Sequence, residues 1–212
     1  MDGVLITFEG IEGCGKSTQA GLFSDWLTHR GIDCVLTREP GGTALGEQIR
    51  KILLHLSNTD IDPLSELLLY LASRAQIVRE VIIPSLKAGK VVLVDRFYDS
   101  TVAYQGWGRG LDKQMILEMN QYTTAGIVPA ITFVFDLDPE TGLSRVSNRS
   151  SADLPDRIEA ERISFHRRVR EGFLKIADEE QRCSLIDGTQ PADVIQDELR
   201  KIFSDRCESE GA

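Results

Sequence analysis

A phosphate-binding loop stands near the start of the chain and constrains how the rest can fold. Residues 10–17 read Gly-Ile-Glu-Gly-Cys-Gly-Lys-Ser, a complete Walker A motif. An apolar run, residues 4–8, comes directly before the motif, and an amphipathic stretch follows it. This order predicts a strand, a phosphate loop and a helix, whose N–H groups and positive dipole end face phosphate oxygens. A Gly-rich turn that merely joins strand to helix is the alternative, and the flanking pattern favours the phosphate loop.

The residue types within this loop suit nucleotide binding. Three glycines let the backbone curl around phosphate, Lys16 is expected to reach the β and γ phosphates, and Ser17 is expected to bind Mg²⁺. Cys14 lies near a helix N-terminus, which could make its thiol oxidisable. The alternative, which we favour, is that Cys14 is a small residue that fits a tight loop.

Alternating apolar and amphipathic segments predict the fold class. Four further apolar runs suit strands buried on both faces of a parallel sheet: residues 34–37, 91–94, 131–135 and 183–186. Helical patterns fill the intervals: residues 16–29, 44–56, 64–88, 113–125, 139–148, 157–179 and 192–203. Pro84 is expected to kink the third of these or to end it early. We therefore expect an α/β three-layer sandwich with a five-stranded parallel sheet, helices on both faces, and ligands at the carboxyl ends of the strands.

Composition excludes several classes of protein. The 212 residues, 42% of them hydrophobic, fit a single domain over residues 1–212. A formal net charge of −9 argues against nucleic-acid binding, so an anionic ligand must be held by local arginines. No signal-peptide pattern and no run of ~18 apolar residues occurs, so we expect a cytoplasmic protein without a membrane partner. The cysteines and histidines lack the spacing of disulfide or structural zinc sites.

Charged residues follow two of the predicted strands at the edge of the sheet where the phosphate loop emerges. Residues 38–43, Arg-Glu-Pro-Gly-Gly-Thr, come after the second strand. A Pro-Gly turn needs neither Arg38 nor Glu39, so we favour a ligand-binding loop over an ordinary turn. Asp95 and Arg96 follow the third strand, where the acid can hold Mg²⁺ or its water shell and the arginine can grip phosphate. A surface ion pair is the competing interpretation.

Further arginines lie within predicted helices or beside them. Arg74 stands in a stretch that is otherwise apolar enough to be partly buried, so it needs a partner. That partner could be an acid such as Glu39, or a bound base and phosphate, and both remain open. Arg145, Arg149 and Arg157 flank a short polar break, which suggests a lid at about residues 149–156 whose arginines close over a transferring phosphate. A solvated basic face is the alternative.

Five motifs taken together resemble one family over nearly the whole chain. They are Phe8-Glu9-Gly10-x-Glu12-Gly13-x-Gly15-Lys16-Ser17, Arg38-Glu39-Pro40-Gly41-Gly42-Thr43, Asp95-Arg96-Phe97, Ser100-Thr101-x-Ala103-Tyr104-Gln105-Gly106 and Asp156-Arg157-Ile158-Glu159. This combination closely resembles bacterial thymidylate kinases. The block at residues 38–43 is much more specific than the Walker motif, which many unrelated ATPases and GTPases share.

The resemblance implies a reaction. It is the transfer of the γ-phosphoryl group of ATP to dTMP, with Mg²⁺, to give dTDP and ADP on the pathway to dTTP. The family resemblance also implies a homodimer, and the long apolar helix near residues 64–83 could pack across a two-fold axis or cover the sheet of one subunit.

The resemblance also implies roles for individual residues. Glu12 would contact the sugar 3′-hydroxyl or the metal region, and Arg38 and Arg96 would bind the monophosphate. Arg74 would face the thymine edge, and Tyr104 would crowd the position of a ribose 2′-hydroxyl.

The expected catalytic set is Lys16, Arg149, Arg96 and Glu12. The expected ATP-binding set is Gly10, Ile11, Glu12, Gly13, Cys14, Gly15, Lys16, Ser17, Thr18 and Arg145. The expected substrate-binding set is Glu12, Arg38, Glu39, Pro40, Arg74, Arg96, Phe97, Ser100, Thr101, Tyr104 and Gln105. The expected metal ligands are Ser17 and Asp95.

The chain departs from the family pattern in places, and other functions compete. The phosphate loop has no basic residue at its variable positions, so the lid must supply that charge, and we assign it to Arg149. Phe97 stands where Tyr or His is often found in the family, and Val102 stands where some relatives have a polar residue. A deoxynucleoside kinase is one rival, although Arg38 and Arg96 suit an acceptor that already carries phosphate. A nucleotide-dependent switch is the other, but the chain lacks an Asn-Lys-x-Asp motif.

Overall fold

The phosphate loop follows the central strand of the sheet, at its carboxyl end. The computed structural model describes residues 3–148 and 156–208. Within them, five parallel strands form one sheet: β1 Val4–Gly10, β2 Cys34–Arg38, β3 Val91–Asp95, β4 Ile131–Asp136 and β5 Cys183–Asp187. The order β2-β3-β1-β4-β5 puts β1 in the middle, with Phe8 paired to Asp95 on β3 and to Phe133 on β4. The predicted α/β fold with a five-stranded parallel sheet is confirmed.

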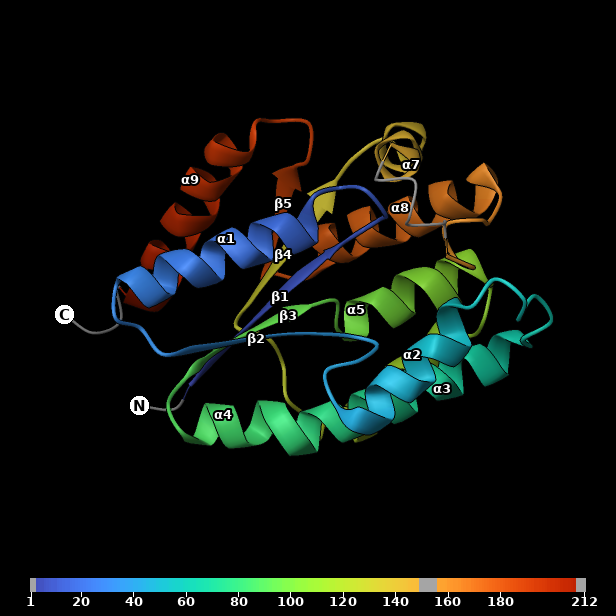
Figure 1. Ribbon diagram of the computed structural model, residues 1–212, viewed down its shortest axis with the longest axis horizontal. Helices are drawn as coiled ribbons and strands as arrows, with labels where there is room; N and C mark the ends of the chain where they lie inside the picture. The colour runs from blue at the N-terminus through green and yellow to red at the C-terminus, as the bar shows by residue number, and fades with distance from the viewer. Residues whose placement is uncertain (1–2, 149–155, 209–212) are drawn as a thin grey trace.

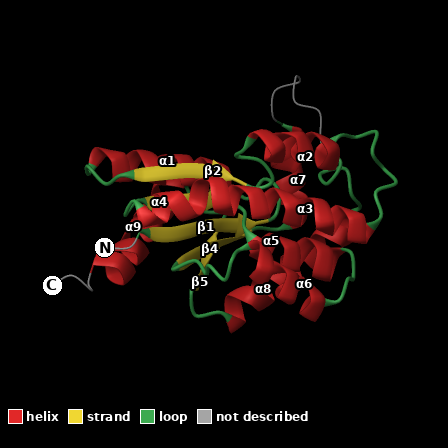
Figure 2. Ribbon diagram, turned by 90° about the horizontal axis from the view of Figure 1, so that it is seen from below, coloured by secondary structure: helices red, strands yellow, loops and turns green. Residues whose placement is uncertain are grey.

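Helices cover both faces of the sheet. They are α1 Lys16–His29, α2 Ala44–Leu54, α3 Pro63–Ile77, α4 Ile83–Lys87, α5 Tyr98–Thr101, α6 Lys113–Thr123, α7 Pro139–Ser147, α8 Ile163–Glu179 and α9 Ala192–Phe203, with π-helical segments at Val78–Ile82, Val102–Gly108 and Ser204–Glu208. Helices α1 and α9 pack together on one face, while α4, α5 and α8 contact strands on the other (Figures 1 and 2). No helix in the described part of the chain has the length and hydropathy that crossing a bilayer requires.

Aromatic side chains join the sheet to its helices. Phe8 and Phe133 lie side by side on the sheet with ring centroids 5.4 Å apart. Phe23 of α1 contacts both of these rings and also Phe203 of α9. All four side chains are buried. Burial of large aromatic surface is a major source of folding free energy, so this cluster stabilises the strands and helices from which the phosphate loop extends.

Two of the predicted helices differ markedly from the structure. The helix expected from residue 157 begins only at Ile163, because Asp156 accepts hydrogen bonds from the backbone N–H groups of Ile158 and Glu159 and holds a turn instead. The segment expected at 64–88 contains a π-helical stretch just before Pro84, whose missing N–H and bulky ring disturb the regular ladder. In place of the expected kink or early stop, the chain changes from α-helix to π-helix at Val78 and returns to α-helix at Ile83.

The sequence analysis missed one helical region entirely. Residues 98–108 form α5 and the π-helical segment Val102–Gly108, where Gly106 and Gly108 favour a loop by local propensity. Tertiary packing decides otherwise. A Cβ on Gly108 would lie 2.6 Å from the ring of Phe165, and one on Gly172 would lie 2.7 Å from Trp107. The two glycines thus allow this segment to pack closely against α8.

Candidate active site

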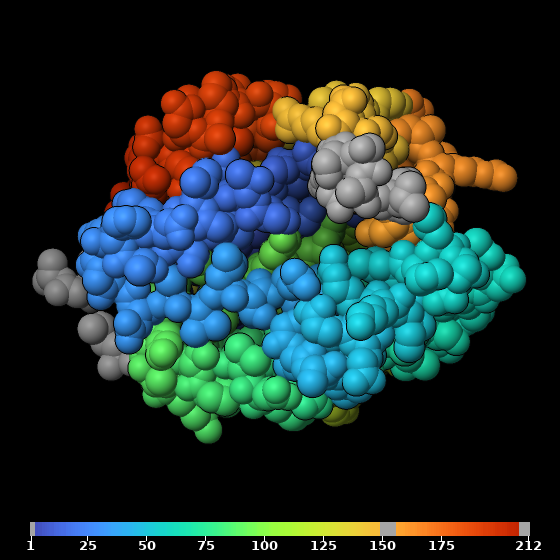
Figure 3. Space-filling view, in the orientation of Figure 1, coloured from blue at the N-terminus to red at the C-terminus, as the bar shows by residue number. Residues whose placement is uncertain are grey.

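A cavity of about 280 Å³ opens at the carboxyl ends of the strands. The space-filling view shows a hollow there, between α1 and α2 (Figure 3). It is lined by residues from the phosphate loop, from both charged loops, from α2 and α3, and from residues 98–108 and 156–159: Glu12, Gly13, Lys16, Ser17, Arg38, Glu39, Pro40, Arg50, Leu54, Tyr70, Asp95, Arg96, Ser100, Thr101, Tyr104, Gln105, Asp156, Ile158 and Glu159. The structure thus brings most of the predicted substrate residues together.

The phosphate loop is held between β1 and α7. Gly13 and Gly15 have positive φ angles of 68° and 94°, a conformation that favours glycine. The loop passes so close to α7 that a Cβ on either Gly13 or Gly142 would collide with the backbone of the other segment. Lys16 donates a hydrogen bond from Nζ to the Ile11 carbonyl at 3.2 Å. This hydrogen bond holds the lysine side chain over the loop. A bound phosphate would replace the Ile11 carbonyl as the hydrogen-bond acceptor of its ammonium group.

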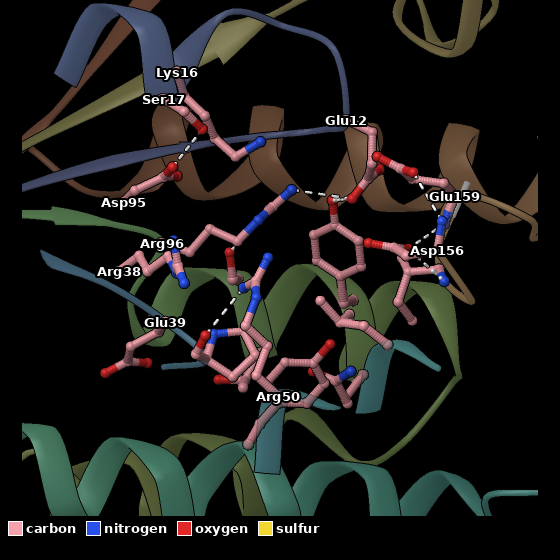
Figure 4. Close-up of a pocket in the computed structure, with 18 of the residues that line it drawn as sticks. Glu12, Lys16, Ser17, Arg38, Glu39, Arg50, Asp95, Arg96, Asp156 and Glu159 are labelled. Atoms are coloured by element: carbon pink, nitrogen blue, oxygen red, sulfur yellow. Dashed lines mark hydrogen bonds and ion pairs between the residues drawn. The ribbon is translucent and has the colours of Figure 1, made fainter. Parts of the chain in front are cut away.

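Ser17 and Asp95 meet at one end of the cavity (Figure 4). The Ser17 hydroxyl donates to Asp95 Oδ2. The other carboxylate oxygen, Oδ1, is buried and accepts no hydrogen bond from any described residue. A buried carboxylate oxygen without a donor costs free energy unless a cation or another donor reaches it. These two side chains are the pair that the sequence nominated for metal binding.

Arg96 joins the turn after β3 to the phosphate loop. Its backbone has φ 70°, in the left-handed region, and its N–H donates to the Phe8 carbonyl at 3.0 Å. From this turn its Nη1 donates to Gly10 O at 2.8 Å and its Nη2 to Glu12 Oε1 at 3.0 Å. The guanidinium also lies 4.9 Å from the ring centre of Tyr104. The strained turn aims Arg96 back across the cavity toward the loop.

Glu9 supports this turn from below, and the sequence analysis gave it no role. The carboxylate accepts hydrogen bonds from the Phe97 N–H at 2.7 Å and the Ser100 hydroxyl at 2.6 Å. Burial, followed by the charge of Asp99, raises the pKa of Glu9 to about 8. Glu9 therefore carries a proton through much of the neutral range.

Glu12 is the opposite case, an acid held in its charged form. Burial alone would raise the pKa of Glu12, but His166, Arg96 and Lys16 outweigh burial and hold that pKa at about 2. His166 Nδ1 lies 3.2 Å from Glu12 Oε2, and the Tyr104 hydroxyl donates to Oε1. Glu12 thus lies at the centre of a cluster of charged and polar side chains that come from the phosphate loop, the turn after β3, residues 98–108 and α8.

Arg38 and Arg74 have different environments. Arg38 is half exposed at the cavity, 3.2 Å from Glu47. Arg74 is only 1% exposed and is not among the cavity-lining residues. It donates to Glu39 at 2.8 Å, and its remaining described bonds go to Thr101, Asn120 and the Phe97 carbonyl. Of the two partners that the sequence left open for Arg74, the acid Glu39 is therefore present. Contact between Arg74 and a substrate stays a proposal.

Some of the other predicted site residues that the structure describes do not line the cavity. Arg145 donates to the backbone carbonyls of Gly13 and Gly188, so it braces the phosphate loop. Phe97 is fully buried in the hydrophobic core. Arg149 and most of the predicted lid lie outside the described residues. Arg157, expected in that lid, is instead buried, with its guanidinium 2.5 Å from Glu66, because a charge in the interior requires a partner.

Besides Glu9, several residues at the site were not identified by the sequence analysis. Tyr70 and Arg50 line the cavity, and His166 contacts Glu12. One signal was available for Tyr70, because it precedes Arg74 by four residues and so shares its face of the helix. His166 and Arg50 sit in amphipathic helices whose patterns do not distinguish them from core or surface residues.

Fold and site together define a class. A parallel sheet whose central strand ends in a Walker A loop, an acid after the neighbouring strand and an adjacent arginine-lined pocket are the parts of a P-loop kinase. The family model described as thymidylate kinase matches residues 8–199. The chain belongs to the thymidylate kinase family.

Individual relatives agree with this assignment. The chain is 47% identical over 201 residues to a thymidylate kinase of Kosmotoga olearia, covering 94% of this chain and 95% of the relative. It is 48% identical over 192 residues to one from Geotalea uraniireducens, covering 89% and 90%. The crystal structure of thymidylate kinase from Ehrlichia chaffeensis superposes with a TM-score of 0.79 at 35% identity, covering 96% of this chain and all of that one.

Proposed function

We propose that this chain transfers the γ-phosphoryl group of ATP to the phosphate of dTMP, giving ADP and dTDP on the route to dTTP. The observation that carries this proposal is one cavity in which Lys16 of the phosphate loop faces the arginines Arg38 and Arg96. A loop for the donor triphosphate and a second cationic site for an anionic acceptor are what transfer between two phosphate groups requires. Because both substrates are nucleotides of the cytoplasm, we also propose a cytoplasmic location.

The two ends of the cavity suit the two ends of dTMP. Arg38, Arg96 and Lys16 gather near the phosphate loop, where they would offset the charge of two phosphate groups pressed together. Tyr70, Leu54 and Ile158 offer ring and aliphatic surface elsewhere in the wall, suited to a flat base. The acceptor is then already an anion, so the enzyme needs charge neutralisation and positioning more than a general base.

Ser17 and Asp95 fit a Mg²⁺ ion. Magnesium prefers oxygen ligands and is usually held by one or two carboxylates together with substrate phosphates and water. The Ser17 hydroxyl supplies one such oxygen, and Asp95 Oδ1, which accepts no hydrogen bond within the described part of the chain, supplies another. When bound, the ion would supply positive charge to the phosphate oxygens. Arg96 would orient the acceptor phosphate, with Glu12 fixing the direction of its guanidinium.

The lid arginine remains part of the proposal. Arg149 lies outside the described residues, and we propose it as the donor that stabilises the transferring phosphoryl group. Arg149→Ala is then expected to lower kcat by at least ~10²-fold with a smaller effect on KM, as for loss of a transition-state donor. Steady-state kinetics with dTMP would measure this, and a near-normal kcat would remove Arg149 from the catalytic set.

We also propose that the protein is a homodimer. Leu64 and Leu68, one turn apart on α3, are 42% and 49% exposed, and Leu117 on the neighbouring α6 is 48% exposed. A row of half-exposed leucines over adjacent helices is typical of a surface that another protein covers. In a two-fold symmetric dimer, the same surface of a second copy of the chain would cover these leucines.

The proposed reaction is tested with a panel of acceptors. The protein is incubated with ATP and Mg²⁺ and, separately, dTMP, dUMP, UMP, CMP, AMP and thymidine, and products are resolved by chromatography. We expect dTDP from dTMP and little product from the ribonucleotides, with Lys16→Met as the inactive control. Turnover of thymidine alone would identify a deoxynucleoside kinase, and ATP hydrolysis that ignores every acceptor would indicate a nucleotide-dependent switch.

A further inference from the structure

We propose that Glu66, buried on α3 outside the cavity, sets the base specificity of the site by holding the Gln105 amide with its oxygen toward the cavity. Gln105 is then a fixed hydrogen-bond acceptor for a base that carries a ring N–H at its pairing edge. This inference rests on the proposed function, because it concerns which nucleoside monophosphate that same cavity accepts.

Glu66 accepts hydrogen bonds from three residues. It is fully buried and accepts from Gln105 Nε2 at 2.8 Å, from Arg109 Nε and Nη2 at 3.1 and 3.0 Å, and from Arg157 Nη2 at 2.5 Å. Burial alone would raise the pKa of Glu66, but Arg109 and Arg157 outweigh it and hold that pKa below its ordinary value. The side chain is therefore a carboxylate, which accepts hydrogen bonds and has no proton to donate.

A carboxylate in this place dictates which way the Gln105 amide points. An amide has one donating end, the NH₂ group, and one accepting end, the carbonyl oxygen. Glu66 can only accept, so the NH₂ group must face it and Oε1 must lie on the other side. Gln105 lines the cavity, and none of the described residues donates a hydrogen bond to its Oε1. With Nε2 held by Glu66, Oε1 is the amide atom of Gln105 that is left to accept a hydrogen bond from a ligand in the cavity.

The acceptor lies at the part of the cavity that suits a base. Glu66 and Tyr70 are four residues apart on α3 and so share one face of the helix, and Tyr70 lines the cavity. The pairing edge of thymine has one donor, N3–H, between two carbonyl oxygens, whereas cytosine has an acceptor at N3. A fixed acceptor therefore satisfies thymine and opposes the ring nitrogen of cytosine.

The network around Glu66 is balanced in charge. Two arginines, Arg109 and Arg157, face two acids, Glu66 and Glu161, and the Arg109–Glu161 distance is 2.5 Å. Glu161 is 28% exposed at the edge of this network and does not line the cavity. It provides a matched control, because its substitution removes a carboxylate from the same arginine without touching Gln105.

The test compares two isosteric substitutions. Glu66→Gln can donate as well as accept, so it releases the Gln105 amide to turn over. We expect the ratio of kcat/KM for dTMP to that for dCMP to fall at least about tenfold in Glu66→Gln, since a mismatched polar group in a site costs about this much or more. Glu161→Gln should leave the ratio unchanged, and KM for ATP should stay near the native value in both. An unchanged ratio in folded Glu66→Gln, or an equal fall in Glu161→Gln, would overturn the role of Glu66.

A second pair of variants guards against loss of folding. Glu66→Gln leaves Arg157 without its buried acid, so the double variant Glu66→Gln with Arg157→Met is compared with Arg157→Met alone. This double variant leaves the Arg109–Glu161 pair balanced, and the specificity ratio is again expected to fall at least about tenfold relative to its parent. The same ratio in both would overturn the proposal. A native protein that makes no dTDP would refute the proposed reaction itself, before any variant is compared.

Discussion

Glu9 shows how one buried acid makes stability depend on pH. Its pKa is near 4.5 in the unfolded chain and about 8 in the folded protein, so between these values folding takes up a proton. Its contribution to the free energy of unfolding is complete below pH 4.5 and falls by up to about 1.4 kcal/mol per pH unit as pH rises. Glu9→Gln does not titrate, and its amide oxygen can accept from the Phe97 N–H while its NH₂ group donates to the Ser100 hydroxyl, so we expect a flatter dependence. Urea unfolding at pH 5, 6, 7 and 8 would check this, and parallel curves for both proteins would contradict it.

Tyr104 separates the effect of a ring from that of a hydroxyl. The ring lines the cavity, while its hydroxyl donates to Glu12. If the ring is what excludes a ribose 2′-hydroxyl, Tyr104→Phe keeps the preference for dUMP over UMP, which differ only at that position, within about threefold, although the lost hydrogen bond lowers kcat/KM for both. Tyr104→Ala should reduce that preference because it opens the wall. Initial rates with the two nucleotides measure this preference. A loss of preference in the Phe variant would show that the Tyr104 hydroxyl, and not the ring, excludes the ribonucleotide.

At the scale of elements, the contact between α7 and the phosphate loop depends on glycine. A Cβ on Gly142 would collide with the Glu12 carbonyl, so Gly142→Ala must push α7 away from the loop. We expect KM for ATP to rise at least about tenfold and stability to fall by about 1–3 kcal/mol, the usual cost of overpacking. Gly21→Ala on α1 is the control, because nothing lies within 4 Å of its Cβ and a helical alanine should stabilise by about 0.5–1 kcal/mol. An unchanged KM for ATP in Gly142→Ala would show that the loop does not depend on this contact.

For the whole molecule, the prediction concerns assembly. Leu68→Asp places a charge in the exposed row of leucines on α3 and α6, and burying that charge against a second copy would be costly. We expect sedimentation equilibrium to show a dimer for the native protein and a monomer for Leu68→Asp. Val194→Asp changes a residue of similar exposure, 47%, on α9, away from that row, and should remain dimeric. A native monomer would refute the proposed assembly.

Several elements of the fold could be predicted because their signals are local. Strands buried on both faces must be apolar throughout, so five short apolar runs marked the five strands to within two residues at either end. Helix α1 and α9 match the predicted ranges 16–29 and 192–203. Residues 98–108 could not be predicted, because their helical form depends on Phe165 and Trp107 packing against glycines in another segment.

The sequence by itself determined the phosphate loop, the parallel sheet behind it and the loops that meet at its edge, because each depends on residues adjacent in the chain. Only the tertiary structure decided how the charged side chains pair. Arg157 turned from an expected lid residue into the buried partner of Glu66, 91 residues away, and Arg74 found Glu39 across 35 residues. A buried charge must be neutralised by whichever opposite charge the packing brings within reach, and no local pattern records that choice.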